Sequence, residues 1–312
     1  MGLALKTPAA HTRPGTGRRR RRRGVLARRT AVDRALWALC ALAALCVVVP
    51  VVSLLGSIVA RAASSWRWDV LTGTTSGNGG GLANAIVGTL VLVVGVAVIA
   101  GMVGVAGGVF LAEFRPEGRG GLLRGASEVL SGIPSIVMGY VGYVTLVVAF
   151  HWGFSLGAAL AVLSVLVVPY IVKSTEVALR QVPTSYREGG EALGMPATRV
   201  LRSLVLKPAL PGIVTGLVVA VAIALGETAP LLYTAGWSDR FPTLQLTHAP
   251  IAYLPYAVYT FYNDPAASAH RLSAAAALVL VLLVLVLIVV ARVLVALTQR
   301  HAPDGGGRPG RR

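Results

Sequence analysis

Residues 184–212 read TSYREGGEALGMPATRVLRSLVLKPALPG and form most of a polar insert, Lys173 to Gly212, between two apolar stretches. The insert is charged and helix-prone, with a glycine break at Gly194 and a closing pair of prolines, Pro208 and Pro211. Spanning a bilayer requires no such segment, because a short and featureless loop can join two membrane helices. We therefore interpret the insert as two short helices, hinged at Gly194, that dock onto a soluble partner.

The remainder of the chain is too apolar for a soluble domain. Hydrophobic residues make up 55% of the sequence, charged residues 13%, and the mean hydropathy is +0.72. Runs of about 20 apolar residues match a hydrocarbon core roughly 30 Å thick. The sequence predicts an all-α integral membrane protein with six transmembrane helices, at about residues 35–60, 83–112, 126–150, 155–180, 213–236 and 272–297.

The distribution of Lys and Arg predicts the orientation. With the N-terminus inside, the inner segments hold 25 of the 29 cations, and only Arg61, Arg67, Arg240 and Arg271 lie outside. Both termini and the polar insert are therefore expected in the cytoplasm, and the chain in the plasma membrane. The external loop is expected at residues 61–82, and the cytoplasmic tails at residues 1–34 and 298–312.

The run Arg18–Arg23 in the N-terminal tail has three possible explanations: a nucleic-acid arm, an export signal, or a disordered basic tail at the anionic lipids of the inner leaflet. An export signal carries a short apolar core and a cleavage site. About 26 apolar residues follow here, which favours a permanent first span. We therefore expect a lipid-facing tail and no nucleic acid.

No chemistry of a catalytic centre can be recognised in the sequence. The five histidines are scattered, without ligand spacing and without a carboxylate cluster beside them, so no metal site is expected. Nucleophile, Walker and H-E-x-x-H motifs are absent. The sequence predicts no catalytic residue and no cofactor, which argues against a membrane enzyme.

Two of the expected spans contain polar or helix-breaking residues. Pro134 lies between Ser131 and Ser135 in the third span, where small residues either allow close helix packing or line an aqueous path. In the fifth span Glu227 is followed by Thr228. An intramembrane carboxylate costs about 2.5–3.5 kcal/mol on insertion scales and faces a partner or a water-filled route. A structural ion pair is the alternative explanation for Glu227.

The insert resembles the signature loop of permease subunits of ABC importers, which has the form E-A-A-x3-G-x9-I-x-L-P. Glu188-Gly189-Gly190 occupies the E-A-A positions, Gly194 is the expected glycine, and the motif closes at Leu204 to Pro208. The chain departs from the pattern at Gly189, Gly190 and Lys207. The resemblance implies the MetI-like permease architecture, with its transmembrane core at residues 83–297 and the coupling loop at residues 173–212.

Three further stretches resemble the PstA type of phosphate permease: GGVFLAEFRPEG (107–118), LSGIPSIVMGYVG (130–142) and ALGETAPLLYTAG (224–236). Ile223 departs from relatives that carry an arginine there. The resemblance implies import of inorganic phosphate, with an ATPase dimer, a second permease of the PstC type and an extracytoplasmic phosphate-binding protein as partners. It also implies that this chain does not hydrolyse ATP.

The site residues follow from the resemblance and from the polar positions together. We expect the ATPase to contact Tyr186, Glu188, Glu191, Gly194 and Met195, with Leu193 and Val200 as further apolar contacts. We expect the substrate pathway to include Ser131, Pro134, Ser135, Glu227 and Thr228. The alternatives are an importer subunit for another oxyanion or small solute, and a membrane scaffold or sensor that transports nothing.

Overall fold

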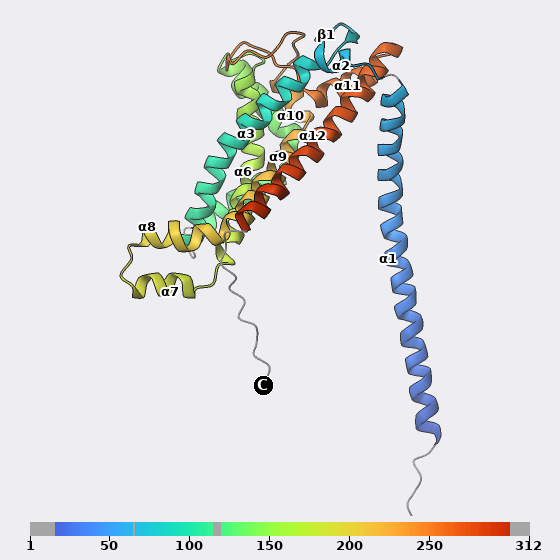
Figure 1. Cartoon of the computed structure of the whole chain (residues 1–312), viewed down its shortest axis with the longest axis vertical. Helices are drawn as coiled ribbons and strands as arrows, with labels where there is room; N and C mark the ends of the chain where they lie inside the picture. The colour runs from blue at the N-terminus through green and yellow to red at the C-terminus, as the bar shows by residue number, and fades with distance from the viewer. Residues whose placement is uncertain (1–15, 65, 115–119, 300–312) are drawn as a thin grey trace, which may run out of the picture. The chain divides into compact units, whose positions relative to one another are not determined.

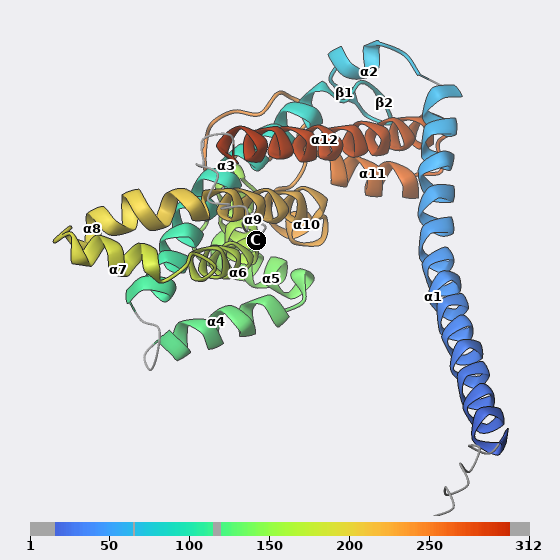
Figure 2. The same cartoon turned by 60° about the horizontal axis from the view of Figure 1, so that its bottom comes forward.

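The computed structural model describes residues 16–64, 66–114 and 120–299, which are almost entirely helical (Figures 1 and 2). The chain divides into two compact units, Met1–Ser57 and Ile58–Arg312. Each unit is described by itself below.

The first unit consists of helix α1, Thr16–Ser64, which continues into the first residues of the second unit. Its apolar part, Val32–Ser64, is long enough to cross a membrane and contains the predicted span 35–60. The helix begins at Thr16, where the sequence predicted a disordered tail. Arginine is a good helix former, so the basic segment can extend a helix that the apolar span has already nucleated.

The second unit contains short elements and long helices in alternation. Its elements are α2 (Asp69–Thr72), β1 (Thr75–Ser76), β2 (Gly79–Gly80), α3 (Ala83–Val109), η1 (Phe110–Phe114), α4 (Gly120–Gly132), α5 (Ser135–Gly142), η2 (Tyr143–Ala149), α6 (Leu156–Arg180), α7 (Ser185–Ala192), α8 (Ala197–Val200), η3 (Leu201–Val205), α9 (Leu206–Gly226), α10 (Ala229–Thr234), α11 (Leu254–Asn263) and α12 (Ala267–Gln299). The strands β1 and β2 form an antiparallel hairpin, and the η elements are π-helical turns.

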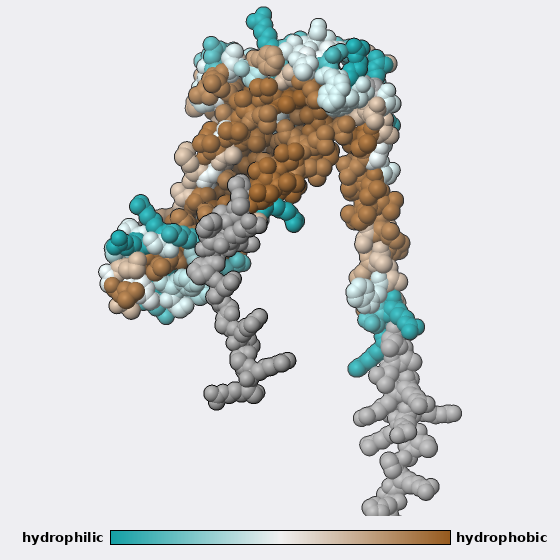
Figure 3. All heavy atoms as spheres, viewed as in Figure 1, coloured by the Kyte–Doolittle hydropathy of each residue, from teal (hydrophilic) through white to brown (hydrophobic). Residues whose placement is uncertain are grey.

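Apolar residues form a belt around the middle of the second unit (Figure 3). The polar loop with α7 and α8 lies at one end, which we call the loop end, and α2 with the β hairpin lies at the other (Figure 1). Within the described residues five helices, including α1, are long and apolar enough to span a membrane, or six if the bent pair 121–132 and 135–149 counts as one span. This arrangement confirms the predicted all-α membrane protein.

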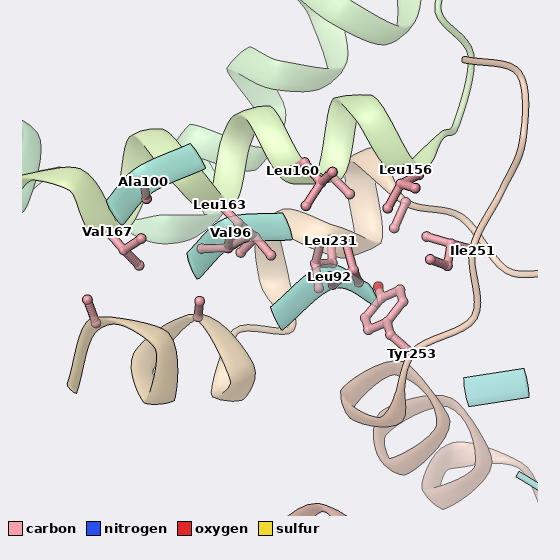
Figure 4. Close-up of a cluster of buried hydrophobic side chains, with 14 of the residues drawn as sticks. Leu92, Val96, Ala100, Leu156, Leu160, Leu163, Val167, Leu231, Ile251 and Tyr253 are labelled. Atoms are coloured by element: carbon pink, nitrogen blue, oxygen red, sulfur yellow. The ribbon is translucent and has the colours of Figure 1, made fainter. Parts of the chain in front are cut away.

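The core of the second unit lies around α6, which packs against α3, α9 and α10. Figure 4 shows buried side chains of these helices meeting one another and the ring of Tyr253. Small residues let the helix backbones approach closely. A Cβ atom on Gly104 of α3 would lie 2.6 Å from the Cβ of Ile171 on α6.

Two of the predicted spans differ from continuous helices. The third is broken at Ile133–Pro134, and its two arms are bent by 99°. The residue before a proline is disfavoured in the helical conformation, which explains a break at this place. The fifth begins earlier than predicted, since Ala197–Gly226 is one helical segment of 30 residues, and it ends at Gly226, before Glu227.

The prolines expected to close the polar insert lie inside this long helical segment instead. Pro208 and Pro211 belong to the first two turns of α9, directly after the π-helical turn Leu201–Val205. A proline cannot donate the usual backbone hydrogen bond, and a wider turn before it changes the bonding pattern where that donor is missing. The second arm of the insert is therefore not a short helix, because it runs on into the fifth span.

Candidate functional site

The polar loop folds as two helical arms that lie side by side at the loop end (Figures 1 and 2). Gly194 connects them with a φ of +68°, a left-handed conformation that favours glycine. The Met195 amide donates a hydrogen bond to the carbonyl of Gly190, and the Gly194 amide donates to that of Glu191. These bonds satisfy carbonyls at the end of α7, as expected for a glycine that terminates a helix.

A second glycine of the motif explains how closely the arms pack. A Cβ atom on Gly190 would lie 2.7 Å from a methyl group of Val200 and 3.0 Å from one of Leu204. Gly189 faces open space, and α7 is regular through both glycines. Glycine therefore replaces alanine at position 190 because α7 and the second arm lie too close together for a Cβ atom there.

Replacing Gly194 by leucine is expected to loosen this turn, because a side chain in the left-handed region costs about 1–2 kcal/mol. Limited proteolysis of the purified protein should cleave the loop about 5- to 30-fold faster. The matched control is Gly189→Leu, which places the same side chain in open space on a helix. Equal cleavage rates for the two variants would contradict the structural role of Gly194.

The residues predicted to contact an ATPase divide into two groups. Tyr186, Glu188 and Glu191 are exposed on α7, and within the described part of the chain neither carboxylate forms an ion pair. Leu193 is 80% exposed beside Gly194, which makes it the most prominent apolar side chain of the loop. The two arms thus present an apolar tip with carboxylates beside it.

Val200 and Met195 have a different position from the one predicted. Val200 is 5% exposed and belongs to a buried cluster that joins the loop to α6 and α9, so the prediction that it contacts a partner is wrong. Met195 is half-buried against the same cluster. These side chains hold the loop on the bundle, because burial of apolar surface favours that contact.

An ion pair that the sequence did not reveal ties the loop to η1, the π-helical turn that follows α3. Arg187 on α7 binds both carboxylate oxygens of Glu113, at 2.6 and 3.2 Å, and also donates to the carbonyls of Leu179 and Val182. The hydrogen bond with Glu113 raises the pKa of the Arg187 guanidinium, against the opposing effect of burial. The arginine therefore stays charged across the physiological range, and the bidentate geometry fixes its direction.

A second carboxylate joins α4 to α6 at the loop end. Glu176 is 4% exposed, and its Oε1 accepts from Arg124 Nε at 2.9 Å and from Arg180 at 3.0 Å. A buried carboxylate is tolerated when it is paired. The spacing of Arg124, Ser127, Glu128 and Ser131 places all four on one face of a helix, but it does not show that Glu176 is the partner of Arg124.

The two broken spans lie against each other through α5 and α10. A Cβ atom on Gly139 would lie 2.5 Å from the Cα of Pro230, and one on Gly142 would lie 3.3 Å from Thr234. The two helices therefore run in parallel, with Gly139 opposite Pro230 and Gly142 opposite Thr234. We call the two interruptions, at Ile133–Pro134 and at Glu227–Thr228, the paired breaks.

Four of the five predicted pathway residues belong to the paired breaks. Pro134 and Ser135 start α5, while Glu227 and Thr228 separate α9 from α10. Glu227 is half-buried, with extended backbone, and its carboxylate has no hydrogen bond or ion pair within the described residues. Interrupted helices within a membrane are tolerated where the freed polar groups face protein or water.

Ser131, the fifth predicted pathway residue, lies apart from this group. It faces a cavity between α4 and α6, together with Arg124 and Lys173. The sequence did not indicate these two cations, because they lie on different helices and meet only in the folded chain.

The fold and the loop define a class of transport proteins. Residues 104–302 match the family of inner membrane components of binding-protein-dependent transport systems. The structure is similar to a chain of the MetNI methionine ABC transporter in an inward-facing conformation, with a TM-score of 0.58, 21% identity, and coverage of 70% of this chain and 95% of that one. At this identity the likeness shows the fold alone, and it confirms the predicted MetI-like architecture.

Closer relatives narrow the class. The phosphate transport system permease protein PstA 2 of Mycobacterium bovis is 55% identical over 279 residues, which cover 89% of this chain and 93% of the relative. The PstA of Yersinia pestis is 41% identical over 219 residues, covering 70% and 73%. The chain belongs to the PstA family of binding-protein-dependent permeases.

Proposed function

We propose that this chain is a transmembrane permease subunit of an ATP-driven importer of inorganic phosphate. The observation that carries the proposal is the 55% identity to a PstA 2 protein over 93% of that relative's length. The chain acts in transport and leaves ATP hydrolysis to a separate subunit. Its partners are an ABC ATPase dimer in the cytoplasm, a second permease of the PstC type and an extracytoplasmic phosphate-binding protein.

The proposed orientation in the plasma membrane has both termini and the loop end in the cytoplasm. The contrast of 25 inner to 4 outer cations supports this orientation. The transmembrane core comprises residues 83–297, preceded by the first helix at 35–60 and the external loop at 61–82. The basic tail at 1–34 meets anionic lipids, and residues 298–312 form the C-terminal tail.

The polar loop, residues 173–212, is the proposed coupling element. Tyr186, Glu188, Glu191 and Gly194 lie on its exposed side, where a groove of the ATPase can receive them. The carboxylates offer charge-assisted bonds to arginines. Met195 supports the tip from the half-buried side. Closure of the ATPase dimer on ATP then moves the loop and, with it, the transmembrane helices.

The paired breaks form this chain's share of the proposed substrate pathway. Phosphate is anionic at neutral pH, so the Glu227 carboxylate does not attract it directly. We infer that Glu227 pairs with a cation of the second permease or accepts a hydrogen bond from protonated phosphate. Ser135 and Thr228 supply hydroxyl groups beside the two breaks, and Pro134 keeps the first break open.

Replacing Glu227 by glutamine is expected to lower phosphate uptake several-fold, because the amide keeps the size of the side chain but loses its charge. Cells that lack their own phosphate importer, supplied with this chain and its partners, provide the measurement with radiolabelled phosphate. Co-purification with the ATPase should not change, which separates transport from assembly. Full uptake by the variant would remove Glu227 from the pathway.

The same cells test the proposed function itself. The unaltered chain should restore uptake of labelled phosphate, and excess unlabelled phosphate should compete far better than sulfate, molybdate or a phosphonate. Absence of uptake in cells where all subunits assemble would refute the proposal. Stronger competition by another oxyanion would assign the importer a different cargo.

A further inference from the structure

A cavity of about 290 Å³ lies between α4, α6 and η1, on the loop side of the paired breaks, and most of its lining is apolar. Its charged and hydroxyl-bearing lining residues come from two helices only. They are Arg124, Ser127, Glu128 and Ser131 on α4, and Tyr170, Lys173 and Glu176 on α6.

The spacing of the α4 residues gives the cavity a polar stripe along one side. The four residues of α4 follow the spacing i, i+3, i+4 and i+7, so they form one stripe along the helix. The opposite side of α4 is apolar, since Leu122 and Val129 are 82% and 67% exposed. In a membrane that apolar side can face lipid, and the polar stripe faces α6.

The charged groups that line the cavity differ in how they are paired. Glu176 is already bound by two guanidinium groups, those of Arg124 and Arg180. Lys173 is exposed and forms no ion pair within the described residues, and the exposed Glu128 forms none either. The lining residues carry two cations and two carboxylates, and Arg180, which binds Glu176 but does not line the cavity, adds a third cation to this network.

We propose that this cavity binds a phosphate-type oxyanion, with the Lys173 ammonium as the cationic group and the Ser127 and Ser131 hydroxyls as hydrogen-bond donors. Ser131 now bonds the Glu128 carbonyl at 2.8 Å and can exchange that local bond for the ligand. The Arg124–Glu176 ion pair holds α4 and α6 together along one wall of the cavity. The inference rests on the proposed function, which supplies the anion, and it gives this chain a cation of its own beside the pathway.

Two sources share this chemistry. Inorganic phosphate can enter the cavity on its way from the paired breaks to the cytoplasm. The phosphodiester of an anionic lipid can reach the same cations, because the cavity lies near the end of the membrane-spanning part of α6.

The test uses the assembled transporter and a single cysteine at Ser131→Cys, with Cys40 and Cys46 replaced by serine. The measured quantity is the rate of thiol labelling by an anionic thiosulfonate reagent divided by the rate for a cationic one. Loss of one charge within several ångströms should lower this ratio about fivefold or more in Lys173→Gln. Glu128→Gln should raise it, and the exposed Arg292→Gln, on α12, should leave it unchanged.

Protection experiments then identify the source of the anion. If inorganic phosphate slows labelling in vesicles of zwitterionic lipid, and does so less in Lys173→Gln, the cavity takes the free ion. If only anionic lipid slows labelling, the oxyanion site stands and its occupant is a headgroup. A ratio that Lys173→Gln leaves unchanged, with no protection by either, overturns the inference. Phosphate uptake by the unaltered chain is measured separately, so that this failure is distinct from failure of the proposed function.

Discussion

Glu176→Ala is expected to destabilise the protein strongly, by about 3–5 kcal/mol if the site behaves like other buried ion pairs that lose one partner. Glu176 is 5% exposed at its side chain, and the change leaves two guanidinium groups without their common acceptor. The Arg124 side chain is only 27% exposed, so water can solvate its unpaired charge only in part. A lower Tm and faster proteolysis near α4 should follow, because α4 contacts the bundle mainly through α6.

The matched control for this prediction is Asp69→Ala. Asp69 pairs with Arg67 at 2.9 Å, the same distance as in the Arg124–Glu176 pair, but the two side chains are 73% and 78% exposed. Exposed pairs contribute about 0–1 kcal/mol. The Tm should therefore barely change, and similar losses in the two variants would mean that burial does not set the strength of the Glu176 network.

Reversing the charge at either end of the Arg187–Glu113 pair is expected to uncouple ATP hydrolysis from transport. Arg187→Glu or Glu113→Arg places like charges where a 2.6 Å bond now holds α7 on η1. Contacting residues are typically coupled by about 0.5–3 kcal/mol, roughly 2- to 100-fold. We expect phosphate moved per ATP to fall about tenfold in each single variant, while hydrolysis continues.

The double variant Arg187→Glu/Glu113→Arg provides the control. It restores opposite charges, so coupling should recover in large part. Recovery should be incomplete, because Arg187 also donates to the Leu179 and Val182 carbonyls, which a carboxylate cannot bond. If the double variant were as impaired as the sum of the single ones, the pair would not act as a connection between loop and bundle.

Much of the fold could be predicted because the bilayer imposes a simple rule on the sequence. Long uncharged runs located the membrane helices, and α6 at Leu156–Arg180 matches its predicted span closely. The polar loop was equally clear, since Gly194 stands between two helix-forming segments and adopts the left-handed backbone that its sequence position suggests.

The features that escaped prediction depend on contacts between distant residues or on local backbone detail. Arg187 and Glu113 are 74 positions apart, and Arg124 and Glu176 are 52 apart. No periodicity within one helix reveals such pairs. Pro134 signalled a break but not a bend of 99°. Pro208 and Pro211 predict a helix end, whereas both lie within α9. No sequence pattern indicates the π turn that precedes them.

The helical segment from Ala197 to Gly226 connects the polar loop to the break at Glu227 without interruption. Its 30 residues correspond to a rod about 45 Å long at 1.5 Å per residue. One end is the arm beside Gly194, and the other end is the break at Glu227. A tilt of about 5° would swing one end by about 4 Å relative to the other. Under the proposed function, an ATPase bound at the loop would therefore not need to approach the cargo, because a movement of the loop end of this segment would also move the break at Glu227.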